Sequence, residues 1–412
     1  MIAHGQVTEV QQDDAALRLE HVIPLGNPVG ALPATVEVAV IGGGIMGASI
    51  AYHLAEAGVT DVLVLERSSL GSGSSAKPLG GIRATFSDPS NVLLGHRSLA
   101  AFESFEARFG TPIGLQQVGY LFLCRTEIEL AAVESSVRMQ NSIGCNSRMI
   151  NPVEASELNP FVDPSCLLGA SFSPRDGYAE PALVVAGYAA AAERLGASFA
   201  EFTEVFDLCT DTDGVHHIAT QRGTVRAKTL VIAAGAWSSW LGDRVGVHLP
   251  VEGVRRQIGF TAQQPQPHPT VPFTLDLSTT LYFHNYRNGL LLGISNPDEP
   301  PGLGREFSYG WTRAFDEAAA VVAPSLAGQQ LVGGWAGLYE NTPDHNAMIG
   351  KADVPGVLYA TGFSGHGFLQ GPAVGEIIRD LYLDREPFMD PTPFSADRFS
   401  DERSLFHEVH II

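Results

Sequence analysis

Three glycines and one acidic residue near the start of the chain have the types and the spacing to bind a dinucleotide. Gly42, Gly44 and Gly47 form the pattern GxGxxG, and Glu66 ends the next apolar run. In such a pattern the first glycine permits a tight turn, the second lets the backbone approach a pyrophosphate, and the third lets a helix pack closely on a strand. A carboxylate at the position of Glu66 accepts hydrogen bonds from a ribose diol and repels a 2′-phosphate. The pattern therefore predicts a site for a dinucleotide without that phosphate.

The elements that must position this pattern are predicted on both sides of it. Residues 36–40 form an apolar strand, residues 45–58 have an apolar helical face, and residues 62–65 form a second strand. The first turn of the helix presents unpaired N–H groups and the positive end of its dipole to phosphates. A purely structural glycine turn is the alternative, but strand, helix, second strand and acid in one unit favour the dinucleotide site. The pattern alone does not distinguish FAD from NAD.

Two later segments favour FAD. Residues 229–237 are predicted to form a short buried strand that ends in small residues, which would let the backbone approach a cofactor; taken alone, this pattern favours a structural strand and glycine turn. Residues 356–361 are predicted to form a strand, residues 362–368 a glycine-rich turn and residues 372–383 a helix. The pyrimidine end of a flavin gathers negative charge on reduction, and a second helix N-terminus can stabilise that charge. One flavin dinucleotide held by turns from both ends of the chain is the simplest explanation.

The composition argues against several other classes of protein. The 412 residues carry a formal net charge of -20, which disfavours a nucleic-acid partner because phosphate binding needs a basic surface. Cys124, Cys145, Cys166 and Cys209 are widely spaced and without a histidine cluster, which predicts reduced core thiols of a cytoplasmic protein and no metal site. We expect neither a signal peptide in the first 35 residues nor an apolar run of the roughly 18 residues that a membrane span needs.

Four segments together resemble a known family. The fingerprint, the stretch VIAAGAWS at 231–238, the stretch GLYENTPDH at 337–345 and the turn GFSGHGF at 362–368 occur in this order. They resemble the D-amino-acid oxidase superfamily, in the branch of sarcosine oxidases, dimethylglycine and proline dehydrogenases and glycine oxidase. The resemblance covers about residues 36–385.

The resemblance implies an α/β fold in which a Rossmann-like FAD-binding domain is interleaved with an α+β substrate domain built on an antiparallel sheet. The expected FAD-binding pieces are 36–110, 150–245 and 335–390, and the expected substrate pieces are 111–149 and 246–334. Residues 1–35 would be an N-terminal extension and residues 391–412 a C-terminal tail. Strand-like runs at 119–124, 256–261, 281–285 and 289–294 suit the sheet of the substrate domain.

The resemblance also implies contacts to FAD along the whole cofactor. The loop 72–75 is expected to pass the pyrophosphate and the ribityl chain, whereas Val205 either meets the adenine through its backbone or is an ordinary strand valine. The expected cofactor contacts are Gly42, Gly44, Ile45, Met46, Gly47, Glu66, Arg67, Ser72, Gly73, Ser74, Ser75, Gly80, Gly81, Val205, Ala234, Gly235, Trp237, Gly337, Gly362, Gly365, His366, Gly367 and Phe368.

The implied reaction is removal of a hydride from a C–H bond next to an amine nitrogen, with flavin N5 as acceptor and hydrolysis of the imine product. The implied substrate is a small secondary amine or amino acid: sarcosine-like, N-methylated or proline-like. The amine must be neutral for its lone pair to assist, so a pocket that favours the uncharged form helps. Arg83 is expected to hold the substrate carboxylate, because a guanidinium fork suits two-point contact with a carboxylate. A surface or domain-bridging arginine is the alternative.

Four further residues are candidates for the reaction site. Tyr339 is expected to orient the amine or the carboxylate, unless it is a packed aromatic at a domain junction. Tyr282 and His284 share one face of a predicted strand and either line the pocket or are ordinary sheet residues. His366 adjoins the flavin or caps the glycine turn. Arg256 is interpreted as structural.

The sequence departs from the family at three positions. Gly337 replaces the cysteine that binds flavin covalently in monomeric sarcosine oxidases, and no histidine follows the loop 72–75, so we expect non-covalent FAD. Leu291 replaces an oxygen-activating lysine, which favours a dehydrogenase or a slow oxidase. Leu369 replaces a second cation for the carboxylate, which favours a larger, less acidic or cyclic substrate over sarcosine.

Two other functions compete with an amine or amino-acid oxidoreductase. One is a partner-dependent subunit of a hetero-oligomer or an assembly factor with little activity alone, and the other is a nicotinamide-dependent dehydrogenase. The electron acceptor is either oxygen or a redox partner.

Overall fold

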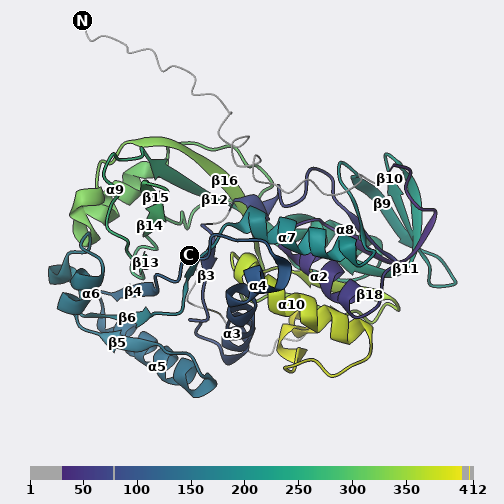
Figure 1. Ribbon diagram of the computed structural model, residues 1–412, viewed down its shortest axis with the longest axis horizontal. Coiled ribbons are helices and arrows are strands. Elements are labelled where there is room, and N and C mark those ends of the chain that lie inside the picture. The colour runs from purple at the N-terminus through teal and green to yellow at the C-terminus, as the bar shows by residue number, and fades with distance from the viewer. Residues whose placement is uncertain (1–29, 78, 401–407, 409–412) are drawn as a thin grey trace, which may run out of the picture.

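The first of two large sheets carries the glycine fingerprint. The computed structural model describes residues 30–77, 79–400 and 408 (Figure 1). In sheet order the strands are β17 (Met348–Lys351), β18 (Val357–Thr361), β11 (Gly223–Ile232), β1 (Thr35–Ile41), β2 (Val62–Leu65) and β8 (Ser198–Ala200), with β10 (His216–Thr220) and β9 (Val205–Thr210) as a hairpin on β11. The pairs β11–β1, β1–β2, β2–β8 and β11–β18 are parallel. This arrangement confirms the predicted Rossmann-like unit.

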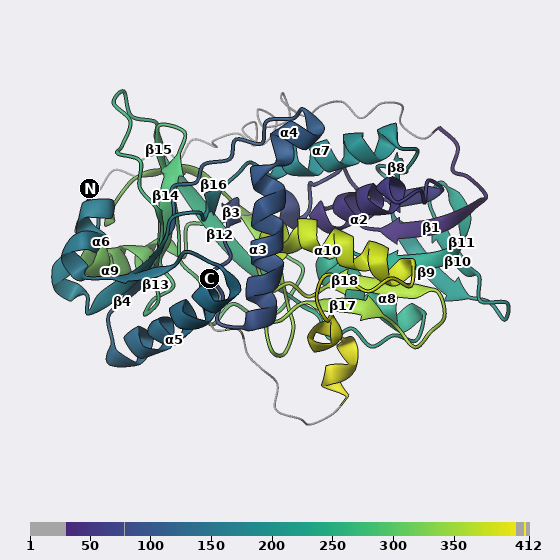
Figure 2. The same cartoon turned by 60° about the horizontal axis from the view of Figure 1, so that its bottom comes forward.

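Both faces of the first sheet are covered, as an apolar parallel strand requires. Val38 and Val40 of β1 belong to one hydrophobic cluster, whereas Ala39 and Ile41 belong to another. The helices on the first face are α2 (Ile45–Glu56), α7 (Pro181–Arg194) and α10 (Gly367–Tyr382), which Figure 2 shows close to one another. The helix α2 begins at Ile45, inside the fingerprint, so its N-terminus points toward the predicted phosphates.

The second large sheet is almost entirely antiparallel, as expected for the predicted substrate domain. Its strands, in sheet order, are β16 (Leu331–Asn341), β12 (Glu252–Thr261), β15 (Gly289–Gly293), β14 (Tyr282–Tyr286), β13 (Phe273–Asp276), β4 (Tyr120–Cys124), β6 (Gly169–Ser173) and β5 (Arg148–Ile150). All pairs are antiparallel except β13 with β4. All four strand-like runs predicted for this sheet are strands in it.

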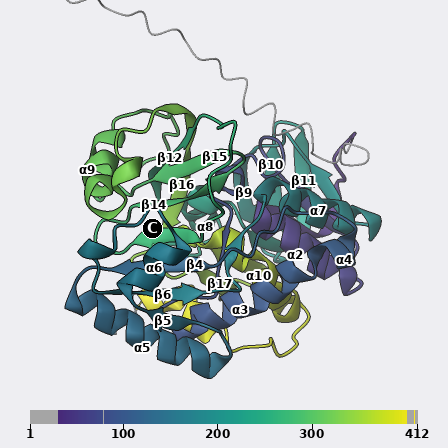
Figure 3. The same cartoon turned by 60° about the vertical axis from the view of Figure 1, so that its left-hand side comes forward.

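Helices cover the far face of the second sheet and separate the two sheets. The helix α9 (Thr312–Val322) lies beside this sheet in Figure 3. Its Phe315 and Val322 belong to one hydrophobic cluster with Leu121, Phe283 and Leu292 of the sheet. The helix α3 (Pro89–Glu103) lies between the two sheet units in Figures 1 and 2. The other α-helices of the described chain are α4 (Phe105–Phe109), α5 (Glu127–Ile143), α6 (Pro152–Leu158) and α8 (Ser238–Arg244). A short two-stranded sheet joins β3 (Gly81–Ile82) to β7 (Gly177–Tyr178).

The predicted division into domain pieces differs from the sheet membership at two places. The strand β6 pairs with β4 in the second sheet, although residues 150–245 were expected with the fingerprint. The strand β16 pairs with β12 from Glu252↔Asn341 to Thr261↔Leu331, so it crosses the expected boundary at residue 335. The run GASFS of β6 has little apolar alternation, and its sheet is decided by pairing with a distant strand.

The C-terminal helix also begins earlier than predicted. The helix α10 starts at Gly367, and Pro372 lies inside it rather than at its first position. The proline removes one backbone hydrogen bond. Burial of Leu369, Ala373 and Ile377 offsets this loss, and Gly371 lets α10 approach Ile45 of α2 closely. Because glycine has a low helix propensity, the glycines around residue 367 make this helix start hard to predict from the sequence.

The predictions about the cysteines and about the two ends of the chain have different outcomes. All four cysteines are free thiols, but the expectation that all are core residues is wrong, because Cys209 of β9 is exposed beside buried Leu208. No helix in residues 30–77 and 79–400 has the length and apolarity to cross a membrane. The same part of the chain holds no group of three or more potential metal-binding side chains. Most of the expected extension 1–35, and residues 401–407 and 409–412 of the expected tail, lie outside the described residues.

Candidate cofactor and substrate site

One elongated cavity of about 500 Å³ joins the fingerprint, the C-terminal glycine turn and the second sheet. Its wall includes Gly42 and Gly44 from the first turn and Gly365 and Gly367 from the last. The two turns therefore meet on one cavity, as the sequence predicts. Its volume lies in the range of small-molecule and cofactor sites.

The fingerprint glycines are required by the backbone. Gly42 has φ +111°, and a Cβ atom there would lie 2.2 Å from the carbonyl oxygen of Ala233. A Cβ atom at Gly47 would lie 1.9 Å from the carbonyl oxygen of Gly42, so Gly47 shapes the turn without lining the cavity. Beside Gly44, the N–H of Ile45 donates to Ser75 Oγ at 2.9 Å. The helix start and the loop 73–75 thus form one polar wall.

Glu66 and Arg67 lie at the dinucleotide end of the cavity. Glu66 accepts hydrogen bonds from the N–H groups of Gly43 and Ser68, both at 2.8 Å, so its carboxylate is fixed at the end of β2. The guanidinium of Arg67 lies 3.5 Å from the ring centroid of Trp237. Val205 also lines this end, together with residues that were not predicted: Thr203, Glu204, Phe206 and Trp240.

A half-buried carboxylate holds the C-terminal turn in place. Glu340 of β16 accepts hydrogen bonds from the N–H of Gly362 at 3.1 Å and from Thr361 Oγ1 at 3.0 Å. Burial raises the pKa of Glu340 to about 7. Gly362 therefore serves the turn and does not line the cavity, whereas Gly365 packs against the ring of Tyr339, where a Cβ atom would lie 2.5 Å from it.

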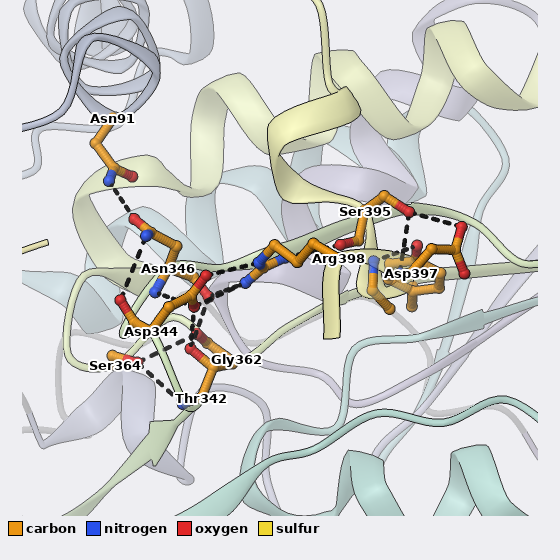
Figure 4. A network of polar contacts seen from close by, with 11 residues as sticks. Asn91, Thr342, Asp344, Asn346, Gly362, Ser364, Ser395, Asp397 and Arg398 are labelled. Atoms are coloured by element: carbon orange, nitrogen blue, oxygen red, sulfur yellow. Dashed lines mark hydrogen bonds and ion pairs between the residues drawn. The ribbon is translucent and has the colours of Figure 1, made fainter. Parts of the chain in front are cut away.

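A polar network anchors this turn to the C-terminal segment (Figure 4). Arg398 makes a two-point contact with Asp344, at 2.7 and 3.0 Å, and donates to the carbonyl oxygen of Asn346 at 2.8 Å. The N–H of Thr342 lies 3.3 Å from Ser364 Oγ, which places the network directly against the glycine turn. The segment after α10 therefore stabilises the glycine turn that lines the cavity.

Arg83 lines the cavity beside His366 and is almost fully buried. Its side chain donates to the carbonyl oxygen of Thr85, its Nη2 atom is 3.3 Å from His366 Nε2, and its guanidinium lies 4.1 Å from the ring centroid of Phe86. Burial lowers the pKa of Arg83 below its usual range. The predicted carboxylate-binding residue and the predicted flavin-adjacent histidine are thus direct neighbours.

Asp176 supports the turn that carries Arg83. Its carboxylate accepts hydrogen bonds from the N–H of Ala84 at 3.2 Å and from Thr85 Oγ1 at 2.9 Å. Burial raises the pKa of Asp176 to about 7, against the opposing effects of these hydrogen bonds and of the charge of Arg83. Asp176 is absent from the wall of this cavity and contacts the turn through the N–H of Ala84 and the hydroxyl of Thr85.

Aromatic side chains of the second sheet form the opposite wall. Tyr120 stacks on Phe273 with ring centroids 4.3 Å apart, and Tyr282 lies across Gly293, where a Cβ atom would be 2.3 Å from its ring. Burial raises the pKa values of Tyr282 and Tyr339 above the usual range. Both phenols are therefore neutral and available as hydrogen-bond donors at neutral pH.

Several predicted site residues lie outside the cavity wall. His284 stacks on the far side of Phe273 at 4.9 Å, and its Nδ1 atom is 2.6 Å from the carbonyl oxygen of Asn285. Burial lowers the pKa of His284 to about 4. Ser72 donates its hydroxyl to the carbonyl oxygen of Ser69, and Gly80 (φ +76°) makes a turn against Ala179. Alternation places Tyr282 and His284 on one face, but only Tyr282 reaches the cavity.

The remaining predicted residues line the cavity, together with several that sequence reasoning missed. The predicted ones not yet placed there are Ile45, Met46, Gly73, Ser74, Gly81, Ala234, Gly235, Gly337 and Phe368. Besides Thr203, Glu204, Phe206 and Trp240, the missed ones include Lys77, Tyr120, Arg256, Phe273 and Glu340. Alternation along β12 gives a signal for Arg256, because it shares a face with Ile258, which also lines the cavity.

Comparison with known proteins gives one consistent result. A family model described as "DAO: FAD dependent oxidoreductase" matches residues 37–381. The chain is 32% identical to glycine oxidase of Geobacillus kaustophilus, covering 88% of this chain and 97% of that protein. It is 30% identical to mitochondrial dimethylglycine dehydrogenase of Mus musculus, covering 88% of this chain but 44% of the relative. The crystal structure of L-proline dehydrogenase from P. horikoshii superposes with a TM-score of 0.84 at 30% identity, covering 90% and 99% of the two chains.

Proposed function

We propose that this chain, which belongs to the DAO family of FAD-dependent oxidoreductases, oxidises a small secondary amine or amino acid to an imine. Water then hydrolyses the imine. The observation that supports this most directly is the single cavity that runs from the fingerprint to a chamber lined by Arg83, Tyr282 and Tyr339. The same cavity is therefore lined by the glycine fingerprint and by Arg83, whose guanidinium suits a carboxylate.

The residues present fit FAD. A side chain at Gly44 would bring its Cβ atom to 2.9 Å from Ser75 Oγ and would fill the space at the start of α2. Fixed Glu66 suits the ribose diol, and the N-terminus of α10 suits the pyrimidine end. Bound FAD supplies the two-electron acceptor for the hydride. Gly337 provides no nucleophile and packs against the Lys77 side chain, which supports non-covalent binding.

The chain's own groups bind and orient the amine. Arg83 is suited to the substrate carboxylate, and Tyr339 is suited to donate a hydrogen bond because its phenol stays neutral. Arg83 and Arg256 both place positive charge at this end of the cavity, which disfavours a protonated amine there. The chamber therefore favours the neutral amine, whose lone pair assists departure of the hydride.

The decisive experiment is anaerobic reduction of the yellow holoprotein by a panel of N-methyl amino acids, proline analogues, glycine and D-amino acids. We expect at least one amine with a carboxylate to bleach the flavin absorbance. Arg83→Gln should raise the KM for that substrate about tenfold or more, since a charge-assisted hydrogen bond is lost. Arg97→Gln is the control, because Arg97 is half exposed and pairs with Glu376 away from the cavity wall. A panel without any bleaching substrate would refute the proposal.

A partner-dependent subunit is the second candidate function. Leu291 is buried in β15 and uncharged, and the chain spans less than half the length of the dimethylglycine dehydrogenases that it matches. Rapid bleaching followed by slow reoxidation in air would favour this candidate, whereas rapid reoxidation would identify an oxidase.

A further inference from the structure

Two guanidinium groups, rather than the one predicted, face the substrate end of the cavity. Arg83 reaches it from the segment after β3 and Arg256 from β12 of the second sheet. The guanidinium of Arg256 lies 5.4 Å from the ring centroid of Tyr339. The positive charges of both arginines oppose the rise that burial causes in the pKa of Tyr339. Both cations are therefore close to the same phenol.

The two arginines differ in the contacts that the protein makes with their guanidinium groups. Arg83 has Thr85, His366 and the ring of Phe86 around its guanidinium. Arg256 donates from Nη1 to the carbonyl oxygen of Arg255 at 3.2 Å, but its buried Nε atom has no hydrogen-bond acceptor among the described residues. A cation withdrawn from water without full hydrogen bonding is costly unless an anion compensates it.

Three acidic side chains line the cavity wall, and none of them forms an ion pair or a hydrogen bond with Arg256 in the described part of the chain. Glu66 accepts from two backbone N–H groups at the fingerprint, Glu340 accepts from Thr361 and Gly362, and Glu204 lies beside Val205 at the dinucleotide end. Uncharged wall residues near Arg256 include Ile258 on the same strand, Gly337 opposite it on β16, and Tyr339. The phenols of Tyr282 and Tyr339 carry no charge at neutral pH. The counter-charge that Arg256 lacks on the cavity wall can therefore come from an anionic group of the ligand.

We propose that Arg256 binds a second anionic group of the substrate, so that the enzyme prefers amines with two carboxylates to amines with one. This inference rests on the proposed function, with Arg83 binding the carboxylate next to the amine. Arg256 binds the carboxylate of the side chain or of the N-substituent. The neutral phenols of Tyr282 and Tyr339 lie beside it as further donors.

Isosteric substrate pairs test this preference. N-methylaspartate is compared with N-methylasparagine, and N-methylglutamate with N-methylglutamine, in anaerobic reduction of the holoenzyme. We expect kcat/KM to be about tenfold or more higher for the acid of the better pair, since a carboxylate pairs with guanidinium and an amide does not. In Arg256→Gln the ratio should fall to about one, mainly through a higher KM for the acid, and Arg256→Lys should restore part of it.

The neighbouring arginine provides the matched control. Arg255 points away from the cavity wall, pairs with Glu299 at 2.7 Å and donates to the carbonyl oxygen of Glu306. Arg255→Gln should leave the acid-to-amide ratio unchanged. A ratio near one in the natural enzyme, or a ratio that survives Arg256→Gln, would overturn the inference. Equal losses for acid and amide together with a shifted flavin potential would show that Arg256 acts on the cofactor instead, and would overturn it as well.

A binding measurement separates this inference from the proposed function. Glutarate and its monoamide, glutaramate, are titrated into the holoprotein and followed by perturbation of the flavin spectrum, which requires no turnover. Glutarate should bind about tenfold more tightly, and Arg256→Gln should remove the difference. If no amine reduces the flavin but glutarate retains its advantage, the proposed function fails while the anion site stands. If amines reduce the flavin and glutarate has no advantage, only the second-anion site fails.

Discussion

At the scale of single residues, the chemistry of the site depends on charged side chains that are buried away from water. Arg83 is 2% exposed and rests on a turn that Asp176, also 2% exposed, holds through Ala84 and Thr85. Burial moves the pKa values of the two groups toward their neutral forms, that of Arg83 downward and that of Asp176 upward. The position of Arg83, the proposed carboxylate-binding residue, is therefore coupled to the protonation of Asp176, which lies outside the cavity wall.

Asp176 gives a pH dependence whose sign can be worked out. Its pKa is raised from 3.8 to about 7 in the folded protein, so the folded state binds the proton more tightly than the unfolded state. This contribution to stability is fully present below pH 3.8 and is lost as pH rises toward 7, by at most about 1.4 kcal/mol per pH unit. We expect Asp176→Asn to flatten the decline of the thermal midpoint between pH 4.5 and 6.5. Parallel profiles for the two proteins would contradict the assignment.

The helices and strands of the site contact one another at positions where only glycine leaves enough room. The strand β1, the fingerprint and the helix α2 leave no room for a side chain at Gly47, whereas the helix α10 reaches α2 through Gly371 and Gly375. Close approach at these points brings the two helix N-termini to one cavity. The cofactor site is thus a property of how two helices pack, and its glycines matter even where they do not face the cavity.

Gly47→Ala tests this point. The added Cβ atom would lie 1.9 Å from the carbonyl oxygen of Gly42, and backbone atoms cannot give way as the end of a side chain can. We expect the variant to lose FAD affinity by at least about a hundredfold, or to fold without a competent site, as measured by titration of the apoprotein with FAD. Gly302→Ala is the control, because its Cβ atom would meet no atom within 4 Å. Normal FAD affinity in Gly47→Ala would show that the turn can relax.

At the scale of the whole molecule, the cavity depends on chain segments far apart in the sequence. The Arg398–Asp344 pair connects the segment after α10 to the loop beside the glycine turn, with the Asp344 side chain 2% exposed (Figure 4). Residues near both ends of the described chain therefore contribute to one site. FAD binding should stabilise the protein as a unit, because a ligand that binds only the folded state shifts the unfolding equilibrium.

Arg398→Met should reveal this long-range support. Removing one partner of a buried ion pair leaves Asp344 uncompensated, which costs about 3–5 kcal/mol. We expect a lower thermal midpoint and weaker FAD binding, measured by calorimetry and by titration of the apoprotein. Arg313→Met is the matched control, since Arg313 pairs with Glu317 on an exposed helix surface and should change the midpoint little. Equal midpoints for the two variants would show that the tail does not hold the turn.

Local patterns allowed much of the architecture to be predicted. The period of apolar residues and the glycine spacing around Gly42 specify β1, α2 and β2 because they reflect contacts between neighbours in the chain. The same holds for the runs that became β4, β12, β14 and β15. The strand β6 and the start of α10 escaped prediction because distant partners, rather than their own residue types, decide their structure.

The sequence by itself determined the family, the dinucleotide site and the identity of Arg83 and Tyr339 as candidates, since each depends on residue type and order. Only the tertiary structure decided which side chains share the chamber. It placed His284 behind Phe273, brought His366 against Arg83, and put Arg256 on the cavity wall although it had been interpreted as structural. The physical reason is that burial and the distance between charges are set by the packing of two sheets, which no single segment of the chain encodes.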